Sequence, residues 1–241
     1  MTNIPVIVQA RMTSTRLPGK VLMPLGDKTF LEHCLDRCAR IEGISDVIVA
    51  TTEEPTCDPI AALADKRGYR VFRGSQHDVL ARYLGAAREA GADAVMRITS
   101  DCPLTDPGTS SHALADFLAN GGDLVTTNIP ASWPIGMDTE IVTMDALEEA
   151  GREGHHKSDR EHVTSFVRRR PMRYALRNLP CPEQGHAHLR ITLDTPADRD
   201  FFVALAESFP GDIATAGWRE IFAHLHAHPE LWSINTDEHF G

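Results

Sequence analysis

Residues 4–20 read IPVIVQARMTSTRLPGK, and this stretch decides the fold class. Its first residues are apolar and rich in β-branched side chains, which predicts a buried strand over 4–9. The loop that follows contains Ser, Thr, Pro and Gly together with three cations, Arg11, Arg16 and Lys20. In an open α/β sheet, ligands bind beyond the carboxyl ends of the strands, so the loop is placed to bind one.

Strand and helix patterns alternate along the first hundred residues. Further strands are predicted at 47–51, 69–72 and 94–98, and helices at 30–38, 60–67 and 79–90. Thr29 and Glu32 form a predicted capping box at the start of the first helix. This alternation predicts an α/β fold with a doubly wound, mostly parallel sheet.

The second half of the chain is less regular. Strands are predicted at 123–127, 139–143, 172–179 and 189–193, and helices at 145–153, 160–169, 198–208 and 218–226. No linker is long enough to separate two domains, so we expect one domain over 1–241. The irregular stretch of about 129–185 is interpreted as an insertion for acceptor binding or dimerisation.

The overall composition excludes several classes of protein. The 241 residues are 42% apolar and 24% charged, as in an ordinary globular protein. The net charge of −10 disfavours a nucleic-acid partner. No apolar run is long enough to span a membrane, and the start lacks a signal-peptide pattern. Five irregularly spaced cysteines predict no disulfide framework, so a cytoplasmic location is expected.

The basic loop suits a phosphate ligand. Ser14, Thr15 and the backbone amides around them can bind phosphate oxygens, and Gly19 allows close approach of the backbone. The loop is not a Walker A motif, because Ser14 stands where glycine is required and Val21 follows Lys20. The pattern favours phosphate binding over a merely solvated basic loop.

Two aspartates each follow a predicted strand, Asp101 after 94–98 and Asp194 after 189–193. Carboxylates beside a polyphosphate are typical ligands of Mg²⁺. Taken singly, Asp101 also fits a turn before Pro103, and Asp194 a helix cap before Pro196. Together with the basic loop, they predict a shared metal site.

Two polar stretches, 133–140 and 158–164, lie in the irregular half. They suit a pocket for a polar small molecule. On pattern alone, surface loops and a helix cap explain them equally well.

Residues 9–20 resemble the opening signature of the cytidylyltransferase superfamily that includes CMP-Kdo and CMP-sialate synthetases. More closely, the chain resembles the SpsF-like cytidylyltransferases of spore coat polysaccharide biosynthesis. Further stretches match in the same order: 73–75 with 78–83, 97–104, 136–140, 160–164, 190–196, and 228–231 with Asn235. The resemblance covers nearly the whole chain.

The resemblance implies a GT-A-like nucleotidyltransferase fold, a homodimer, and transfer of CMP from CTP to a small acidic acceptor such as a nonulosonic sugar acid. By position, the implied catalytic groups are Arg16, Lys20 and Asp101, and the implied nucleotide-binding residues are Gln9, Ala10, Arg11, Ser14, Thr15, Arg16, Lys20, Arg73 and Ser100. The implied acceptor-binding residues are Asp138, Glu140, Arg160, His162 and Arg190, and the implied ligands of Mg²⁺ or Mn²⁺ are Asp101 and Asp194. Arg160 is the best candidate for an acceptor oxyanion, because a guanidinium fork matches one.

Two other functions are considered. One is CMP activation of a phosphonate or another non-sugar acid, since Gln76-His77 and Ile135 differ from the family pattern. The other is a GT-A glycosyltransferase, which would generally have a second aspartate at position 103, where this chain has Pro103.

Overall fold

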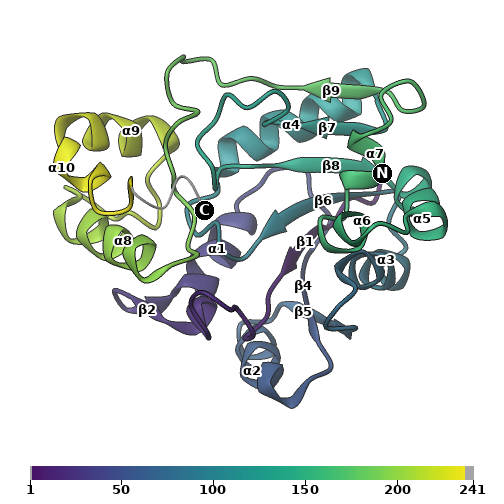
Figure 1. Cartoon of the computed structure of the whole chain (residues 1–241), viewed down its shortest axis with the longest axis horizontal. Coiled ribbons are helices and arrows are strands. Elements are labelled where there is room, and N and C mark those ends of the chain that lie inside the picture. Colours follow the sequence, from purple (N-terminus) through teal and green to yellow (C-terminus); the bar gives the residue numbers. More distant parts are fainter. Residues whose placement is uncertain (1, 237–241) are drawn as a thin grey trace.

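The centre of the molecule is a seven-stranded sheet with the strand order β5-β4-β1-β6-β8-β7-β9 (Figure 1). The structure, a computed structural model, describes residues 2–236. The strands are β1 (Val6–Gln9), β4 (Val47–Thr52), β5 (Arg70–Gly74), β6 (Ala94–Thr99), β7 (Leu124–Thr126), β8 (Glu140–Thr143) and β9 (Leu176–Asn178). A small hairpin, β2 (Pro24–Leu25) with β3 (Lys28–Thr29), lies outside this sheet.

The sheet is mostly parallel, as the sequence predicts. Strand β1 pairs in parallel with β4 and β6, and β4 pairs in parallel with β5. Strand β8 runs antiparallel to both β6 and β7, while β9 is parallel to β7. The carboxyl ends of β1 and β6 therefore meet at one edge, and the amino end of β8 lies at that edge too.

Helices cover both faces of the sheet, which makes it doubly wound. Successive side chains of a strand point to opposite faces, so Val6 and Val8 pack in one core while Ile7 packs in the other. The first core includes residues of α1 (Phe30–Cys38), α2 (Asp58–Lys66) and α4 (Pro107–Asn120). The second includes residues of α3 (Val79–Ala90), α5 (Met144–Glu153) and α7 (Ser165–Arg168).

The C-terminal helices form a third core beside the sheet (Figure 1). They are α8 (Pro196–Ser208), α9 (Trp218–Ala227) and α10 (Pro229–Trp232). Phe30 at the start of α1 packs in this core together with Ile191 and Leu193. The third core therefore anchors the segment that leads into Asp194.

Several predicted local features are present. The capping box of Thr29 and Glu32 starts α1, and Gly91 ends α3 in the left-handed conformation. All five cysteines are buried and free. Within residues 2–236 the structure has no helix long and apolar enough to cross a membrane.

Two expectations were wrong, and one helix was not predicted. The predicted helix 160–169 is two short helices, α6 (Lys157–Glu161) and α7, because Val163 takes a left-handed φ of 51° between them. Residues 189–193 form no strand with 172–179, only an isolated bridge between Ile135 and Arg190. Helix α4 was missed, although Asp106-Pro107 is a typical helix start and Gly121 marks its end.

Gly136 is expected to be essential for packing in the irregular segment before β8. Its φ is 102°, and a Cβ there would lie 2.0 Å from the carbonyl oxygen of Ile191. We expect Gly136→Ala to destabilise the protein by about 1–3 kcal/mol more than a substitution that adds backbone strain alone. The added methyl group would force the backbone at residue 136 away from the backbone of Ile191. Urea unfolding measures the difference.

Gly185→Ala is the matched control, because Gly185 has a similar φ of 91° and nothing lies within 4 Å of its added Cβ. Equal losses of stability in the two variants would contradict the close packing of Gly136 on Ile191.

Candidate active site

The basic loop turns back on itself directly after β1. The carbonyl oxygen of Met12 accepts hydrogen bonds from the backbone N–H groups of Ser14, at 3.0 Å, and Gly19, at 2.9 Å. Gly19 has a left-handed φ of 72°, which allows the chain to turn into the short 3₁₀ helix Lys20–Leu22. The loop thus presents Lys20 at the start of a rigid element.

Lys20 brings the two distant aspartates together. Its buried Nζ donates to the Leu193 carbonyl oxygen at 2.5 Å, to Asp194 Oδ1 at 2.8 Å and to Asp101 Oδ2 at 3.2 Å. The backbone carbonyl of Asp101 also accepts from Leu193 N at 2.8 Å and from Thr192 Oγ1 at 3.2 Å. Residues 192–194 are therefore tied to the end of β6 by both backbone and side chains.

Asp194 sits in a strongly positive environment. Arg16 Nη2 lies 3.1 Å from Asp194 Oδ2, and Arg190 Nη2 lies 2.9 Å from the same atom. Burial would raise the pKa of Asp194, but Lys20, Arg16 and Arg190 together hold that pKa below its usual value. Asp194 is therefore ionised near neutral pH.

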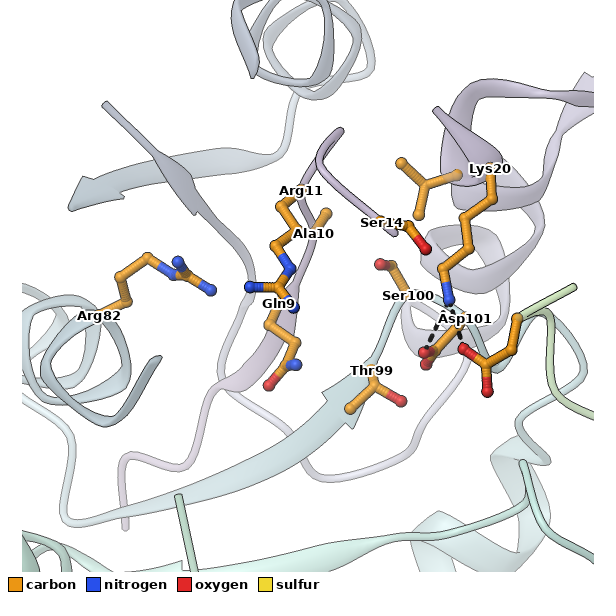
Figure 2. Close-up of a pocket in the computed structure, with 11 residues that line it drawn as sticks. Gln9, Ala10, Arg11, Ser14, Lys20, Arg82, Thr99, Ser100 and Asp101 are labelled. Carbon is orange, nitrogen blue, oxygen red and sulfur yellow. Dashed lines mark hydrogen bonds and ion pairs between the residues drawn. The ribbon is translucent and has the colours of Figure 1, made fainter. Parts of the chain in front are cut away.

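A pocket opens above these charges (Figure 2). Its lining residues from the predicted nucleotide set are Gln9, Ala10, Arg11, Ser14, Lys20 and Ser100, joined by both aspartates. Sequence reasoning missed Arg82 of α3 and Thr99 of β6, which line the same pocket. No sequence pattern singles out Arg82, because its burial is a property of the folded chain.

A second pocket adjoins the first and shares Thr99, Asp101 and Asp194 with it. Its other charged lining residues are Arg97, Asp138, Glu140 and Arg168. The two pockets together form one site with the aspartates at their junction.

Glu140 is the buried centre of the second pocket's charge network. It lies opposite Arg97 in the register of β6 and β8, and Arg97 Nη1 lies 2.8 Å from its carboxylate. Thr164 Oγ1 donates to Glu140 at 2.9 Å, and Arg168 Nη1 lies 3.6 Å away. Glu140 therefore positions two arginines, and their positive charges balance its negative charge.

Asp138 lies near this network. It accepts hydrogen bonds from the Asn128 side chain and from Gly136 N. Burial raises the pKa of Asp138. Asp138 is thus a carboxyl group that burial makes harder to ionise.

Six sequence-predicted residues line neither pocket: Thr15, Arg16, Arg73, Arg160, His162 and Arg190. Thr15 is exposed, and His162 is exposed at the end of α6. Arg73 pairs with Asp58 and donates to the carbonyl groups of Thr52 and Glu54. Arg160 and Arg190 are held by other partners.

Arg160 pairs with Asp78 and donates to the Gly151 carbonyl at 3.1 Å, so its fork is used to connect α6 with α3 and α5. Arg190 binds Asp198 at 2.9 Å behind Asp194. Arg16 also does not line a pocket, but its exposed guanidinium contacts Asp194 at the rim. The structure thus separates residues that touch the pockets from residues that support them.

The carboxylate pair fits a divalent cation that retains other ligands. Oxygens of Asp101 and Asp194 already converge on one ammonium group. Among residues 2–236, no three His, Cys, Asp or Glu side chains form a metal-binding group. A metal here would therefore need phosphate or water oxygens to complete its shell, as Mg²⁺ prefers.

An open, mostly parallel α/β sheet that ends in a basic loop and a carboxylate pair is the architecture of a nucleotidyltransferase. The model of the cytidylyltransferase family matches residues 5–209, and the chain belongs to that family. It is a CTP-dependent nucleotidyltransferase, as the sequence resemblance implies.

Relatives of known name cover nearly the whole chain. The spore coat polysaccharide biosynthesis protein SpsF of Bacillus subtilis is 31% identical over 236 residues, which cover 95% of this chain and 97% of that protein. The structure of a cytidylyltransferase from Leptospira borgpetersenii matches with a TM-score of 0.91 and 31% identity, over 96% of this chain and 97% of that one.

A CTP complex of CMP:2-keto-3-deoxy-manno-octonic acid synthetase matches with a TM-score of 0.66, over 86% of this chain and 99% of that chain. Its sequence identity of 17% supports the shared fold alone. The predicted fold class is confirmed by this match and by the sheet.

The loop cations are expected to contribute most to CTP binding. Arg16→Met and Lys20→Met should each weaken CTP binding or turnover by about 2–4 kcal/mol, because each removes a charge-assisted contact to the triphosphate. Isothermal titration calorimetry with CTP measures the change.

Arg73→Met is the comparison variant, because Arg73 carries the same charge but lies outside both pockets. It should leave CTP affinity unchanged. Wild-type affinity in both loop variants would refute the assignment of the loop to the triphosphate.

Proposed function

We propose that the enzyme transfers CMP from CTP to a small acidic acceptor, a nonulosonic sugar acid or a similar molecule, and releases pyrophosphate in a Mg²⁺-dependent reaction. One observation carries the proposal. Two adjoining pockets share Asp101 and Asp194, with the basic loop on one side and two arginines on the other. Such a site can align a nucleoside triphosphate and an anionic acceptor for direct transfer.

The reaction is an in-line displacement at the α-phosphorus of CTP. An acceptor oxygen forms the new bond to phosphorus, and a hydroxyl acceptor gives up its proton to solvent. The bond to the β-phosphate bridge oxygen breaks, and pyrophosphate leaves with that electron pair. Negative charge spreads over the phosphate oxygens, so cations stabilise the transition state more than a covalent group would. Lys20 and Arg16 are placed for this role at the mouth of the loop.

Asp101 and Asp194 are the proposed ligands of Mg²⁺, with Mn²⁺ as an alternative. The ion, when bound, would neutralise phosphate charge beside the reacting phosphorus. With both carboxylates engaged in this way, the Lys20 ammonium is available to donate to the triphosphate. Without any cation, two carboxylates beside a triphosphate would repel it, so Lys20 and the metal have complementary roles.

The acceptor is assigned to the second pocket, with Arg168 as its anchor in place of Arg160. Arg168 is partly exposed, lies 3.6 Å from Glu140 and lines this pocket. The Nε atom of Arg97 is buried and forms no hydrogen bond. Both guanidinium groups lie against Glu140, while Asp138 also lines the pocket and the two shared aspartates are assigned to the metal. The free donors of the two arginines suit an acceptor carboxylate.

The alternatives differ in support. A phosphonate acceptor would use the same arginines, but the name of one relative, a protein of spore coat polysaccharide biosynthesis, favours a sugar acid. Family membership argues against the glycosyltransferase alternative. From kinship we also propose that the enzyme is a homodimer in the cytoplasm. We further propose one domain over 1–241, with an acceptor-binding or dimerisation insertion at about 129–185.

Removal of divalent metal should abolish pyrophosphate release. EDTA is expected to stop turnover and Mg²⁺ or Mn²⁺ to restore it, because the triphosphate charge would then be unneutralised beside the aspartates. Asp101→Asn and Asp194→Asn should each lose most turnover while circular dichroism shows a retained fold. Asp200→Asn, at an exposed ion pair, is the control. Full activity in EDTA would overturn the metal proposal.

Arg168→Met should raise the KM for the acceptor about 10- to 100-fold and leave the KM for CTP unchanged, because one charge-assisted contact of about 1.5–3 kcal/mol is lost. The assay follows pyrophosphate release with 2-keto-3-deoxy-manno-octonic acid and with methylphosphonate. Arg160→Met is the control and should leave both constants near wild type. If Arg160→Met raised the KM for the acceptor and Arg168→Met did not, Arg160 would be the acceptor anchor, as the sequence predicts.

A further inference from the structure

Arg82 is a buried arginine with an unused hydrogen-bonding edge. It is 1% exposed, and its Nη1 donates to the carbonyl oxygens of Ser75, at 2.7 Å, and Gln76, at 3.4 Å. Nε is buried with no partner, and Nη2 donates to no described residue. Nε and Nη2 lie on the same edge of a guanidinium, so Arg82 offers two parallel donors side by side.

The surroundings of Arg82 do not account for its burial. No carboxylate of the described residues forms an ion pair with it, and Asp78 near the start of the same helix is bound by Arg160. Burial lowers the pKa of Arg82, which reflects the cost of this position. A buried donor edge that is costly and unsatisfied is typical of a site completed by a ligand.

Gln9 supplies the complementary group in the same pocket. Its Oε1 is buried and accepts no hydrogen bond. Figure 2 shows Arg82 on the far side of Gln9 and Arg11 from Lys20 and Asp101. The pocket therefore has a cation-and-carboxylate end for the phosphates and a separate end with two unused donors and one unused acceptor.

We propose that Arg82 and Gln9 select cytosine. The Nε and Nη2 donors of Arg82 bind O2 and N3 of the ring, and Gln9 Oε1 accepts a hydrogen bond from the N4 amino group. Uracil has a proton on N3 and an acceptor at position 4. Its N3–H group would therefore face the N–H donors of Arg82, and no hydrogen bond could form there. The glutamine amide can rotate to serve either base, but a guanidinium has no acceptor, so Arg82 is the discriminating residue.

A phosphate ligand for Arg82 is the competing interpretation. It accounts for the donor edge, but it requires the Gln9 amide to turn its N–H groups to the phosphate in place of the oxygen that is buried and unpartnered in this structure. A cytosine ring satisfies both groups at once. The inference rests on the placement of CTP in this pocket under the proposed function, and does not depend on the acceptor or the metal.

Direct binding of CTP, UTP and inorganic tripolyphosphate, measured by calorimetry in the presence of Mg²⁺, tests the inference. For Arg82→Lys, which keeps the charge but loses the paired donors, we expect the preference for CTP over UTP to fall about 10- to 100-fold. Gln9→Leu should weaken CTP more than tripolyphosphate. Arg88→Lys, on the exposed side of the same helix, should bind as wild type, and thermal unfolding checks that each variant folds.

The outcomes separate the hypotheses. Equal losses for CTP, UTP and tripolyphosphate in Arg82→Lys would make Arg82 a phosphate contact and overturn the inference. If both Arg82→Lys and Gln9→Leu kept the preference for CTP while Lys20→Met lost binding, the selection of cytosine by Arg82 and Gln9 would be rejected. The placement of the nucleotide would still stand. Unchanged CTP binding in all three variants would instead reject the placement of the nucleotide, and with it the proposed site.

Discussion

The buried ammonium group of Lys20 is the interaction on which the site depends. It joins a loop after the first strand, the end of the fourth predicted strand and a segment near residue 193, three parts of the chain that are far apart in sequence. Two partly buried carboxylates would repel each other without this cation, so the fold of the C-terminal segment and the charge of the site are coupled. Asp198 extends the coupling, because it holds Arg190 against Asp194 and also caps α8.

The sequence is sufficient for the part of the fold that follows local rules. Apolar strand patterns and helix caps locate β1, β4, β5 and β6, and the alternation of strand and helix predicts their parallel order. The errors lie where distant contacts override local pattern. Residues 189–193 alternate like a strand, but their backbone is fixed by Asp101 and Ile135 rather than by a sheet neighbour.

In the site, too, some residues could be predicted from local motifs and others depend on contacts between distant parts of the chain. The loop residues and the two aspartates carry recognisable motifs, and the structure brings them together. Arg160 and Arg168 are only eight positions apart, and no local pattern shows which one faces the pocket. The left-handed backbone of Val163 decides it, because it interrupts the helix between them and gives the two arginines different neighbours. Arg82 could not be singled out either, since its importance comes from the absence of a partner in three dimensions.

The reversed direction of β8 has a consequence for how this family can diversify. The residues that line the first pocket leave the sheet at the carboxyl ends of β1 and β6, whereas Asp138 and Glu140 of the second pocket stand where the chain enters β8. In the sequence, the first set of residues thus comes at or after the ends of its strands, and the second set comes just before or at the start of its strand. Apart from the contact of Gly136 with Ile191, the stretch that precedes β8 can vary in sequence without altering the loop after β1 or the end of β6. Evolution could therefore exchange one acceptor for another while keeping CTP as the common donor.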